Sequence, residues 1–307
     1  MIKSVTVVNC YKDELYLDLF NSHEQYGIFI KSISGIGPGK ATINTVSLAS
    51  DDGGIFNSAR LDVRNIVIDL AFYQSAELGN TIEDARHITY KYFPNKKPLT
   101  LIFETDRRTL FIEGYVESNE PNIFSSEEGC QISIICPDPK FYDFYGSGNI
   151  EFGGISKKFH FPYSNNSVSE KKTVFGVYVL DNIKNIVYSG DEETGITIYI
   201  HPKTGLSGLE IVDMTLNQSI SIKDSAIVID GTTGILSHDE ITICTIKGRK
   251  NAVLRRNGVE YNIMNALGRN PAWFQLVKGD NSFMFTAASG GDDLEMLISF
   301  DQAYSGV

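Results

Sequence analysis

The chain has 307 residues, of which 42% are hydrophobic and 21% are charged, and its formal net charge is −11. This length favours two domains, and this composition excludes a chain that is disordered throughout. The net charge is −7 over residues 1–143 and −4 over residues 144–307, so neither half has the basic excess that grips nucleic-acid phosphates.

Alternating apolar and polar residues predict that strands dominate the first half of the chain. One helix is predicted over Ile82–Tyr92, because Thr81 and Asp84 form a capping-box-like start and Pro94 ends the apolar helical pattern. The predicted strands are Ser4–Asn9, Glu14–Leu19, Tyr26–Ser34, Thr42–Ser47, Val63–Phe72, Leu99–Glu104, Leu110–Ser118 and Gln131–Cys136.

The second half is predicted to be almost entirely strand, with turn signals every 8–12 residues or so. Arg256-Asn257-Gly258-Val259 is typical of a tight β-hairpin. This pattern favours an antiparallel β-sandwich or jelly roll. The predicted strands are Lys157–Phe161, Lys172–Val179, Ile186–Tyr188, Gly195–His201, Leu209–Leu216, Gln218–Ile222, Ala226–Asp230, Gly234–Leu236, Glu240–Thr245, Ala252–Arg256, Val259–Asn262, Trp273–Val277, Asn281–Thr286 and Glu295–Asp301.

The segment Gln131–Tyr145 predicts the junction between the two domains. A strand runs into two prolines, which fix φ and remove two N–H donors, so the sheet must end there. Aromatic residues follow at once and are expected to pack at the junction. The domains are therefore predicted as 1–143 and 144–307, and the junction residues are Pro137, Asp138, Pro139, Phe141 and Tyr142.

The residues that could carry chemistry form no catalytic or metal-binding pattern. The four cysteines (Cys10, Cys130, Cys136 and Cys244) contain no C-x-x-C pair, and no two histidines lie two or four residues apart. We expect no catalytic residues, no metal and no cofactor. No apolar run approaches the ~18 residues of a membrane helix, so we expect no membrane insertion and folding in a reducing cytoplasm.

A glycine-rich segment at Ser34–Lys40 resembles a phosphate-binding loop only superficially. Ser34 stands where such a loop needs glycine, Ala41 stands where it needs serine or threonine, and a strand follows in place of a helix. We interpret it as a loop between strands and, with a second glycine pair further on, as a candidate arm for contacting a neighbouring subunit. The glycines of this candidate arm are Gly35, Gly37, Gly39, Gly53 and Gly54.

Trp273 is the sole tryptophan, and it is the candidate sugar contact if the second domain binds saccharides. The alternative is a core aromatic, because Trp273 alternates with its neighbours along a predicted strand. A hydrolase with two facing carboxylates also stays open, although the sequence nominates no particular pair.

Two stretches together resemble a known family. Leu99–Asp143 combines LTLIFE, a turn, IEGYVES and QISIICPDPKFYD, downstream of the capped helix, and Gly208–Phe285 combines GLEIVDM, ITICT, the Arg-Asn-Gly hairpin and WFQLVKGDN. Over essentially the whole chain, this is similar to the siphophage distal tail protein family. The fold implied is mainly β with one helix: an N-terminal α+β split-barrel-like ring domain, followed by a C-terminal galectin-like sandwich.

The resemblance implies a structural role. Family members form homo-hexameric rings at the tip of a phage tail, between the tail tube protein and the tail-tip hub protein. Their outer sandwiches carry receptor-binding or accessory proteins, and DNA passes through the ring without specific binding. We therefore expect a non-enzymatic virion component of the tail tip, assembled in the host cytoplasm. The alternative is a carbohydrate-binding adaptor module that contacts the host cell wall.

Overall fold

The chain divides into two units in the computed structural model, which describes residues 1–20, 26–48, 52–74, 79–152, 154–157, 176–179 and 182–307. Unit 1 comprises Met1–Gly146 and Ala303–Val307, and unit 2 comprises Ser147–Gln302. The last five residues, predicted to belong to the second domain, lie in unit 1. Two chain crossings therefore join the units.

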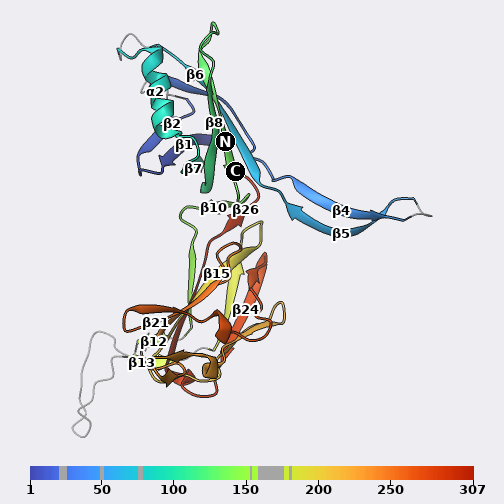
Figure 1. Cartoon of the computed structure of the whole chain (residues 1–307), viewed down its shortest axis with the longest axis vertical. Helices are drawn as coiled ribbons and strands as arrows, with labels where there is room; N and C mark the ends of the chain where they lie inside the picture. Colours follow the sequence, from blue (N-terminus) through green and yellow to red (C-terminus); the bar gives the residue numbers. More distant parts are fainter. Residues whose placement is uncertain (21–25, 49–51, 75–78, 153, 158–175, 180–181) are drawn as a thin grey trace. The chain divides into compact units, whose positions relative to one another are not determined.

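Unit 1 is built on one antiparallel sheet with the strand order β2-β1-β7-β8-β9-β6-β3, to which β10 and β26 add at β8 (Figure 1). Apolar side chains of alternate residues on every long strand form its core. The strands of unit 1 are β1 (Ile2–Asn9), β2 (Glu14–Asp18), β3 (Ile28–Ser34), β4 (Ala41–Ser47), β5 (Gly54–Leu61), β6 (Arg64–Phe72), β7 (Pro98–Thr105), β8 (Thr109–Pro121), β9 (Gly129–Cys136), β10 (Phe141–Asp143) and β26 (Ala303–Tyr304).

The predicted helix is present as α2 (Ile82–Tyr92). Thr81 and Asp84 form a reciprocal capping box, because the Thr81 side chain accepts from the Asp84 N–H and the Asp84 side chain accepts from the Thr81 N–H. Ala85 is buried against the core of unit 1, with Ile82 and Ile88 partly buried beside it. The apolar face of the helix therefore covers the core side of the sheet.

The strands β4 and β5 form a hairpin of their own, which we call the arm (Ala41–Leu61). They pair with each other and form a separate two-stranded sheet (Figure 1). The sequence predicts β4 but not β5. A two-stranded hairpin is marginal in water without further packing.

The junction segment ends strand β9, but it does not end the main sheet as predicted, because the chain rejoins that sheet directly after the prolines. β9 stops at Cys136, and after Pro137–Lys140 the chain forms β10, which pairs with both β8 and the returning β26. Phe141 is fully buried and makes an edge-on contact with Phe103. The predicted junction residues therefore lie within unit 1, a few residues before the first crossing.

Unit 2 contains two main antiparallel sheets, β11-β25-β15-β20-β21-β22 and β14-β24-β16-β17, around one apolar core. Three short 3₁₀ helices, η1 (Asp224–Ala226), η2 (Met264–Ala266) and η3 (Gly291–Asp293), lie in its connections. Its strands are β11 (Gly148–Phe152), β12 (Gly154–Lys157), β13 (Gly176–Val179), β14 (Ile183–Tyr188), β15 (Thr194–Pro202), β16 (Glu210–Asp213), β17 (Gln218–Ser221), β18 (Val228–Ile229), β19 (Thr232–Thr233), β20 (Glu240–Cys244), β21 (Asn251–Arg256), β22 (Val259–Asn262), β23 (Gln275–Leu276), β24 (Gly279–Thr286) and β25 (Leu294–Phe300).

The predicted fold class, mainly β with one helix and antiparallel sheets, is confirmed. Several strands of unit 2 are shorter than predicted: Trp273–Val277 reduces to Gln275–Leu276, and Gly234–Leu236 reduces to a bridge at Ile235. The predictions for Lys157–Phe161 and Lys172–Val179 fall partly outside the described residues.

Candidate interaction surfaces

The arm carries an apolar stripe on one face. Cross-strand partners share a face, so the pairs Ile43–Ala59, Thr45–Phe56 and Ala41–Leu61 lie together. The other face is polar near the root, where Asn44 donates to Ser58, and apolar further from it, where Val46 lies opposite Ile55. Ile43 is 63% exposed and Phe56 is 64% exposed. We call Ile43, Phe56, Ala59 and Leu61 the arm stripe.

The root of the arm is held by one buried arginine. Arg64, at the start of β6, donates to the carbonyl oxygens of Gly35 and Gly37 in the loop before β4. It also donates to the carbonyls of Pro139 at 2.7 Å and Ser305 at 2.8 Å. One guanidinium thus joins the arm root, the Pro-Asp-Pro segment and the returning C-terminal segment.

The five glycines predicted for the arm fall at its two ends. Gly35, Gly37 and Gly39 form the root, where Gly35 has φ +81° and a Cβ would lie 2.1 Å from the Asn65 carbonyl oxygen. Gly53 and Gly54 lie at the end of the hairpin remote from the root. The glycines shape the arm, whereas the exposed surface is its apolar stripe, which the sequence analysis did not single out.

The outward face of the unit 1 sheet is rich in carboxylates. Side chains alternate along β7, β8, β9 and β6, with apolar residues directed to the core. Polar bonds link the outward residues across strands: Asp69 accepts from Ser32 and Gln131. The carboxylates of this face, which we call the acidic face, are Asp69, Glu104, Glu113, Glu117 and Glu120.

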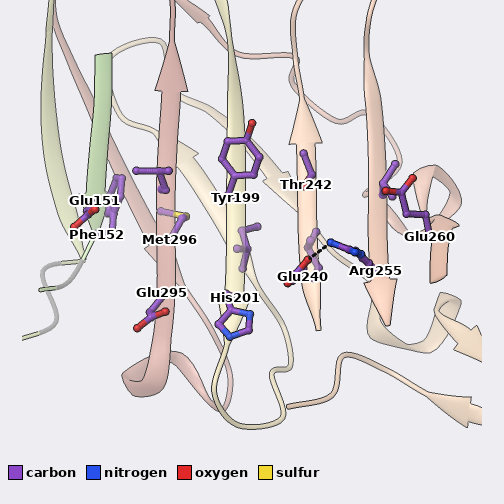
Figure 2. A pocket seen from close by; sticks show the side chains of 14 residues that line it. Glu151, Phe152, Tyr199, His201, Glu240, Thr242, Arg255, Glu260, Glu295 and Met296 are labelled. Atoms are coloured by element: carbon purple, nitrogen blue, oxygen red, sulfur yellow. Dashed lines mark hydrogen bonds and ion pairs between the residues drawn. The ribbon is translucent and has the colours of Figure 1, made fainter. Parts of the chain in front are cut away.

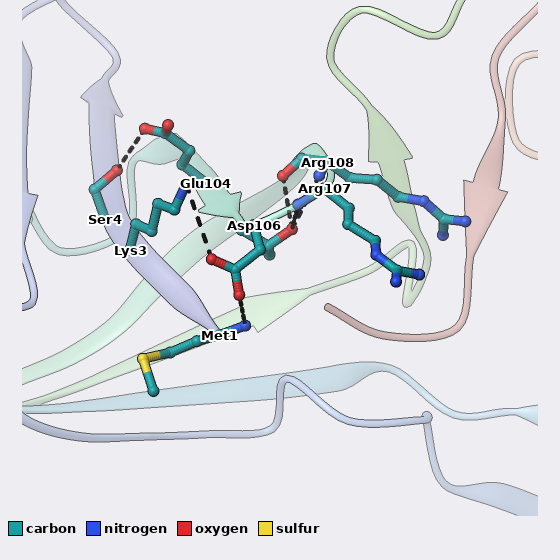
Figure 3. Close-up of polar contacts among 8 residues, drawn as sticks. Met1, Lys3, Ser4, Glu104, Asp106, Arg107 and Arg108 are labelled. Atoms are coloured by element: carbon teal, nitrogen blue, oxygen red, sulfur yellow. Dashed lines mark hydrogen bonds and ion pairs between the residues drawn. The ribbon is translucent and has the colours of Figure 1, made fainter.

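The β7–β8 turn gathers charges of both signs (Figure 3). Asp106 accepts from the Met1 amino group and lies 3.9 Å from the Lys3 ammonium. The bond to Met1 lowers the pKa of Asp106 below its usual value. Arg108 stacks on Tyr304 at 4.2 Å from the ring centroid. The charges of this turn therefore form a network within unit 1.

A groove of about 900 Å³ runs over the outer face of the larger sheet of unit 2 (Figure 2). Phe152, Ile200 and Met296 border it from strands whose side chains alternate, and their own side chains point to the core on the opposite side of the sheet. Tyr199 stands near its centre and is 45% exposed. In register, Tyr199 lies between Leu297 on β25 and Thr242 on β20.

Four carboxylates and one arginine line this groove. Arg255 donates to Glu240 at 3.3 Å, and Glu295 is paired with Lys203 at 2.6 Å. Glu151 on β11 and Glu260 on β22 are exposed on the two outermost strands of the sheet. The groove is therefore acidic, with Glu151 and Glu260 at its opposite rims.

The candidate sugar contact Trp273 lies outside the groove lining. It is partly buried against the core of unit 2, and the Lys250 ammonium lies 5.1 Å from its ring centroid. Among the described residues, no three His, Cys, Asp or Glu side chains cluster so as to hold a metal ion. Within the same residues, no helix is long and apolar enough to cross a membrane.

The fold and these surfaces define a β protein of two units. Unit 1 is an α+β unit that carries the arm, and unit 2 is a β-sandwich inserted before β26, the last strand of unit 1. The Dit (distal tail) protein of phage SPP1, described as a paradigm of the hub adsorption apparatus in phages that infect Gram-positive bacteria, has a similar structure. Its TM-score is 0.59 at 15% sequence identity, over 97% of this chain and 98% of that chain. The resemblance predicted from the sequence is thus confirmed at the level of the fold.

Two structures of the phage p2 baseplate in its activated conformation are also similar. The strontium form matches 96% of this chain and 97% of that chain at 11% identity, with a TM-score of 0.48. The calcium form matches 97% and 98% at 12% identity, also with a TM-score of 0.48. No family model matches this sequence, and no curated protein matches it either.

Proposed function

We propose that this protein is a structural component of a phage or prophage-derived tail tip, in which six copies form a ring through unit 1. The observation that carries the proposal is the similarity of fold to the SPP1 Dit protein over almost the full length of both chains. The ring would join the tail tube protein to the tail-tip hub protein.

The arm supports a ring because its apolar stripe has no partner within the described residues of its own chain. Exposed apolar stripes mark contacts with other proteins. A hairpin that is marginal alone gains stability when its stripe packs on a neighbour. A head-to-tail contact of this kind closes into a ring when the rotation between neighbours permits.

The acidic face supports a channel for DNA. Carboxylates at the lumen of a ring repel the phosphate backbone, so DNA passes without sticking. We assign the acidic face to the lumen, since it concentrates five carboxylates on one side of four adjacent strands. Receptor-binding or accessory proteins would dock on unit 2, which leaves unit 1 to form the ring.

Substitutions on the two faces of the arm test the ring. Ile43→Asp with Phe56→Asp places two charges in the arm stripe, and sedimentation of this variant should show single chains that retain the circular dichroism of the wild type. The matched control is Asn44→Asp with Ser58→Asp, which places the same charges on the polar part of the other face and should still assemble. Equal assembly of both variants would contradict the role of the stripe.

The alternative function, a carbohydrate-binding adaptor for the host cell wall, has weaker support. Its nominated contact, Trp273, is held between the core and Lys250. A saccharide that bound there would have to displace this packing. Sugar binding lost in Trp273→Ala without unfolding would favour this alternative.

A further inference from the structure

The groove over the larger sheet of unit 2 has a charge and a length that suit one kind of ligand. We propose that it binds an extended cationic peptide segment of another protein, with lysine or arginine side chains at the two ends of an apolar stretch. The inference concerns unit 2 alone, so it holds or fails independently of whether unit 1 forms a ring.

The charge of the groove is the first argument. Glu151, Glu240, Glu260 and Glu295 outnumber Arg255 in its lining, and even with Lys203 counted two carboxylates remain in excess. The excess charge lies at the rims, because Glu240 and Glu295 are each paired with a cation. An acidic surface repels nucleic acid and anionic membranes and attracts a basic segment.

The spacing of the rim carboxylates is the second argument. β11 and β22 are the outermost strands of the six-stranded order, so Glu151 and Glu260 are five strand spacings apart, about 24 Å. An extended peptide rises about 3.3 Å per residue, so roughly seven residues span that distance. Cations at both ends of such a segment would reach both carboxylates.

The middle of the groove is the third argument. Leu297, Tyr199, Thr242 and Val253 follow one another across four adjacent strands in register. This row offers apolar contact and one exposed aromatic ring between the two charged rims. Tyrosine rings also attract cations over their faces.

A saccharide fits this groove less well. Tyr199 is the exposed ring of the central row, and two of the four carboxylates that could accept from sugar hydroxyls, Glu240 and Glu295, are already paired with Arg255 and Lys203. Breaking these pairs would oppose binding of a neutral ligand, whereas a cationic segment uses the carboxylates at the rims.

A titration of the full-length chain with a labelled peptide tests the proposal. The probe has seven residues, with lysine at both ends and valine and threonine between them. We expect saturable binding that weakens as salt is raised from low to physiological concentration, because exposed charges are screened. A peptide of the same composition with both lysines at one end should bind about fivefold more weakly or worse.

Two matched variants localise the site. Glu151→Gln with Glu260→Gln should weaken binding of the probe about tenfold, equivalent to about 1.4 kcal/mol. Glu192→Gln with Glu210→Gln removes the same charge elsewhere in unit 2 and should leave binding unchanged. Tyr199→Ala, at an exposed position, should also weaken it.

Three results would overturn the proposal. The first is no binding of the end-charged peptide at millimolar concentration. The second is equal loss in the two double variants. The third is binding of neutral cell-wall oligosaccharides that Tyr199→Ala abolishes while the peptide fails to compete.

Discussion

The Arg64 guanidinium donates through Nε to the Pro139 carbonyl oxygen at 2.7 Å and lies 4.7 Å above the Phe141 ring. This contact joins the first residue of β6 to the segment that ends β9. The same side chain also bonds to the loop before the arm and to the returning C-terminal segment. Three segments far apart in sequence therefore depend on one buried charge.

Replacing Arg64 should destabilise unit 1 more than any other single arginine change. Arg64→Met removes a buried guanidinium and the donor to four carbonyl oxygens, two of them on the half-buried Pro139 and Ser305, and we expect a loss of about 3 kcal/mol in the free energy of unfolding. Urea denaturation followed by circular dichroism measures it. Arg60→Met, at an exposed arginine of β5, is the control and should change stability by less than about 0.5 kcal/mol.

A methyl group added at Gly35 should destabilise the arm root, whereas one added at Gly37 should not. Gly35→Ala forces a side chain into positive φ against the Asn65 carbonyl oxygen, so we expect at least about 2 kcal/mol of destabilisation. Gly37→Ala meets open space, because no atom lies within 4 Å of the added Cβ. Thermal unfolding of the two variants side by side gives the comparison, and equal melting temperatures would contradict it.

The four cysteines should differ in their reaction with iodoacetamide. Burial raises the pKa of the Cys130 and Cys136 thiols to about 12, so almost no thiolate is present at pH 8. Cys10 and Cys244 are partly exposed and should be alkylated first. Peptide mapping by mass spectrometry after brief labelling reads the order. Early labelling of Cys130 or Cys136 in folded protein would be inconsistent with a buried core position.

The charge of Asp301 should lower the free energy of unfolding of unit 2 at neutral pH. Partial burial raises the pKa of this carboxyl above its usual value, while Arg249 opposes the shift. The folded state thus holds the proton more tightly than the unfolded state, so folding is penalised at neutral pH and the penalty fades as pH falls through the folded pKa. Asp301→Asn should melt higher than the wild type at pH 7.

Melting curves at pH 7 and near pH 4 complete that comparison. The advantage of Asp301→Asn should shrink at the lower pH, where the wild-type carboxyl becomes protonated. An advantage that grew on acidification would mean that the charge of Asp301 stabilises the folded state.

Charge reversal on the acidic face should create DNA binding. Glu113→Lys with Glu120→Lys changes the charge of this surface by four units per chain, and assembled protein should then shift duplex DNA in a gel at low salt. Glu83→Lys with Asp191→Lys changes the total charge equally but lies outside the acidic face. If this control shifted DNA as strongly, total charge and not the acidic face would control DNA binding.

Local sequence signals predicted the elements whose contacts lie close in sequence. The helix at Ile82–Tyr92 was predicted to the residue, because its capping box and Pro94 act locally. The strand that ends at Cys136 was likewise marked by the prolines after it. The sequence does not predict β5, because an exposed hairpin has no core to impose alternation of apolar and polar residues. A bulge at Asn57 and Ser58 also interrupts the alternation along this strand.

The interaction surfaces depend on pairing between strands far apart in the sequence, which no local pattern predicts. The groove assembles Glu151 and Glu260 from strands more than a hundred residues apart, so no motif could indicate it. The sequence does not indicate a role for Arg64, because its partners are backbone carbonyls whose positions only the fold defines. The return of Ala303–Val307 to unit 1 rests on a two-residue strand, too short to carry a periodic signal.

The mass of the assembled protein tests the ring most directly. Mass photometry with negative-stain imaging of the purified chain at micromolar concentration should show particles of six copies of the 34.1-kDa chain, with a six-fold ring and a central hole. Single chains or dimers alone, at every concentration and also in the presence of tail tube protein, would contradict the proposed ring.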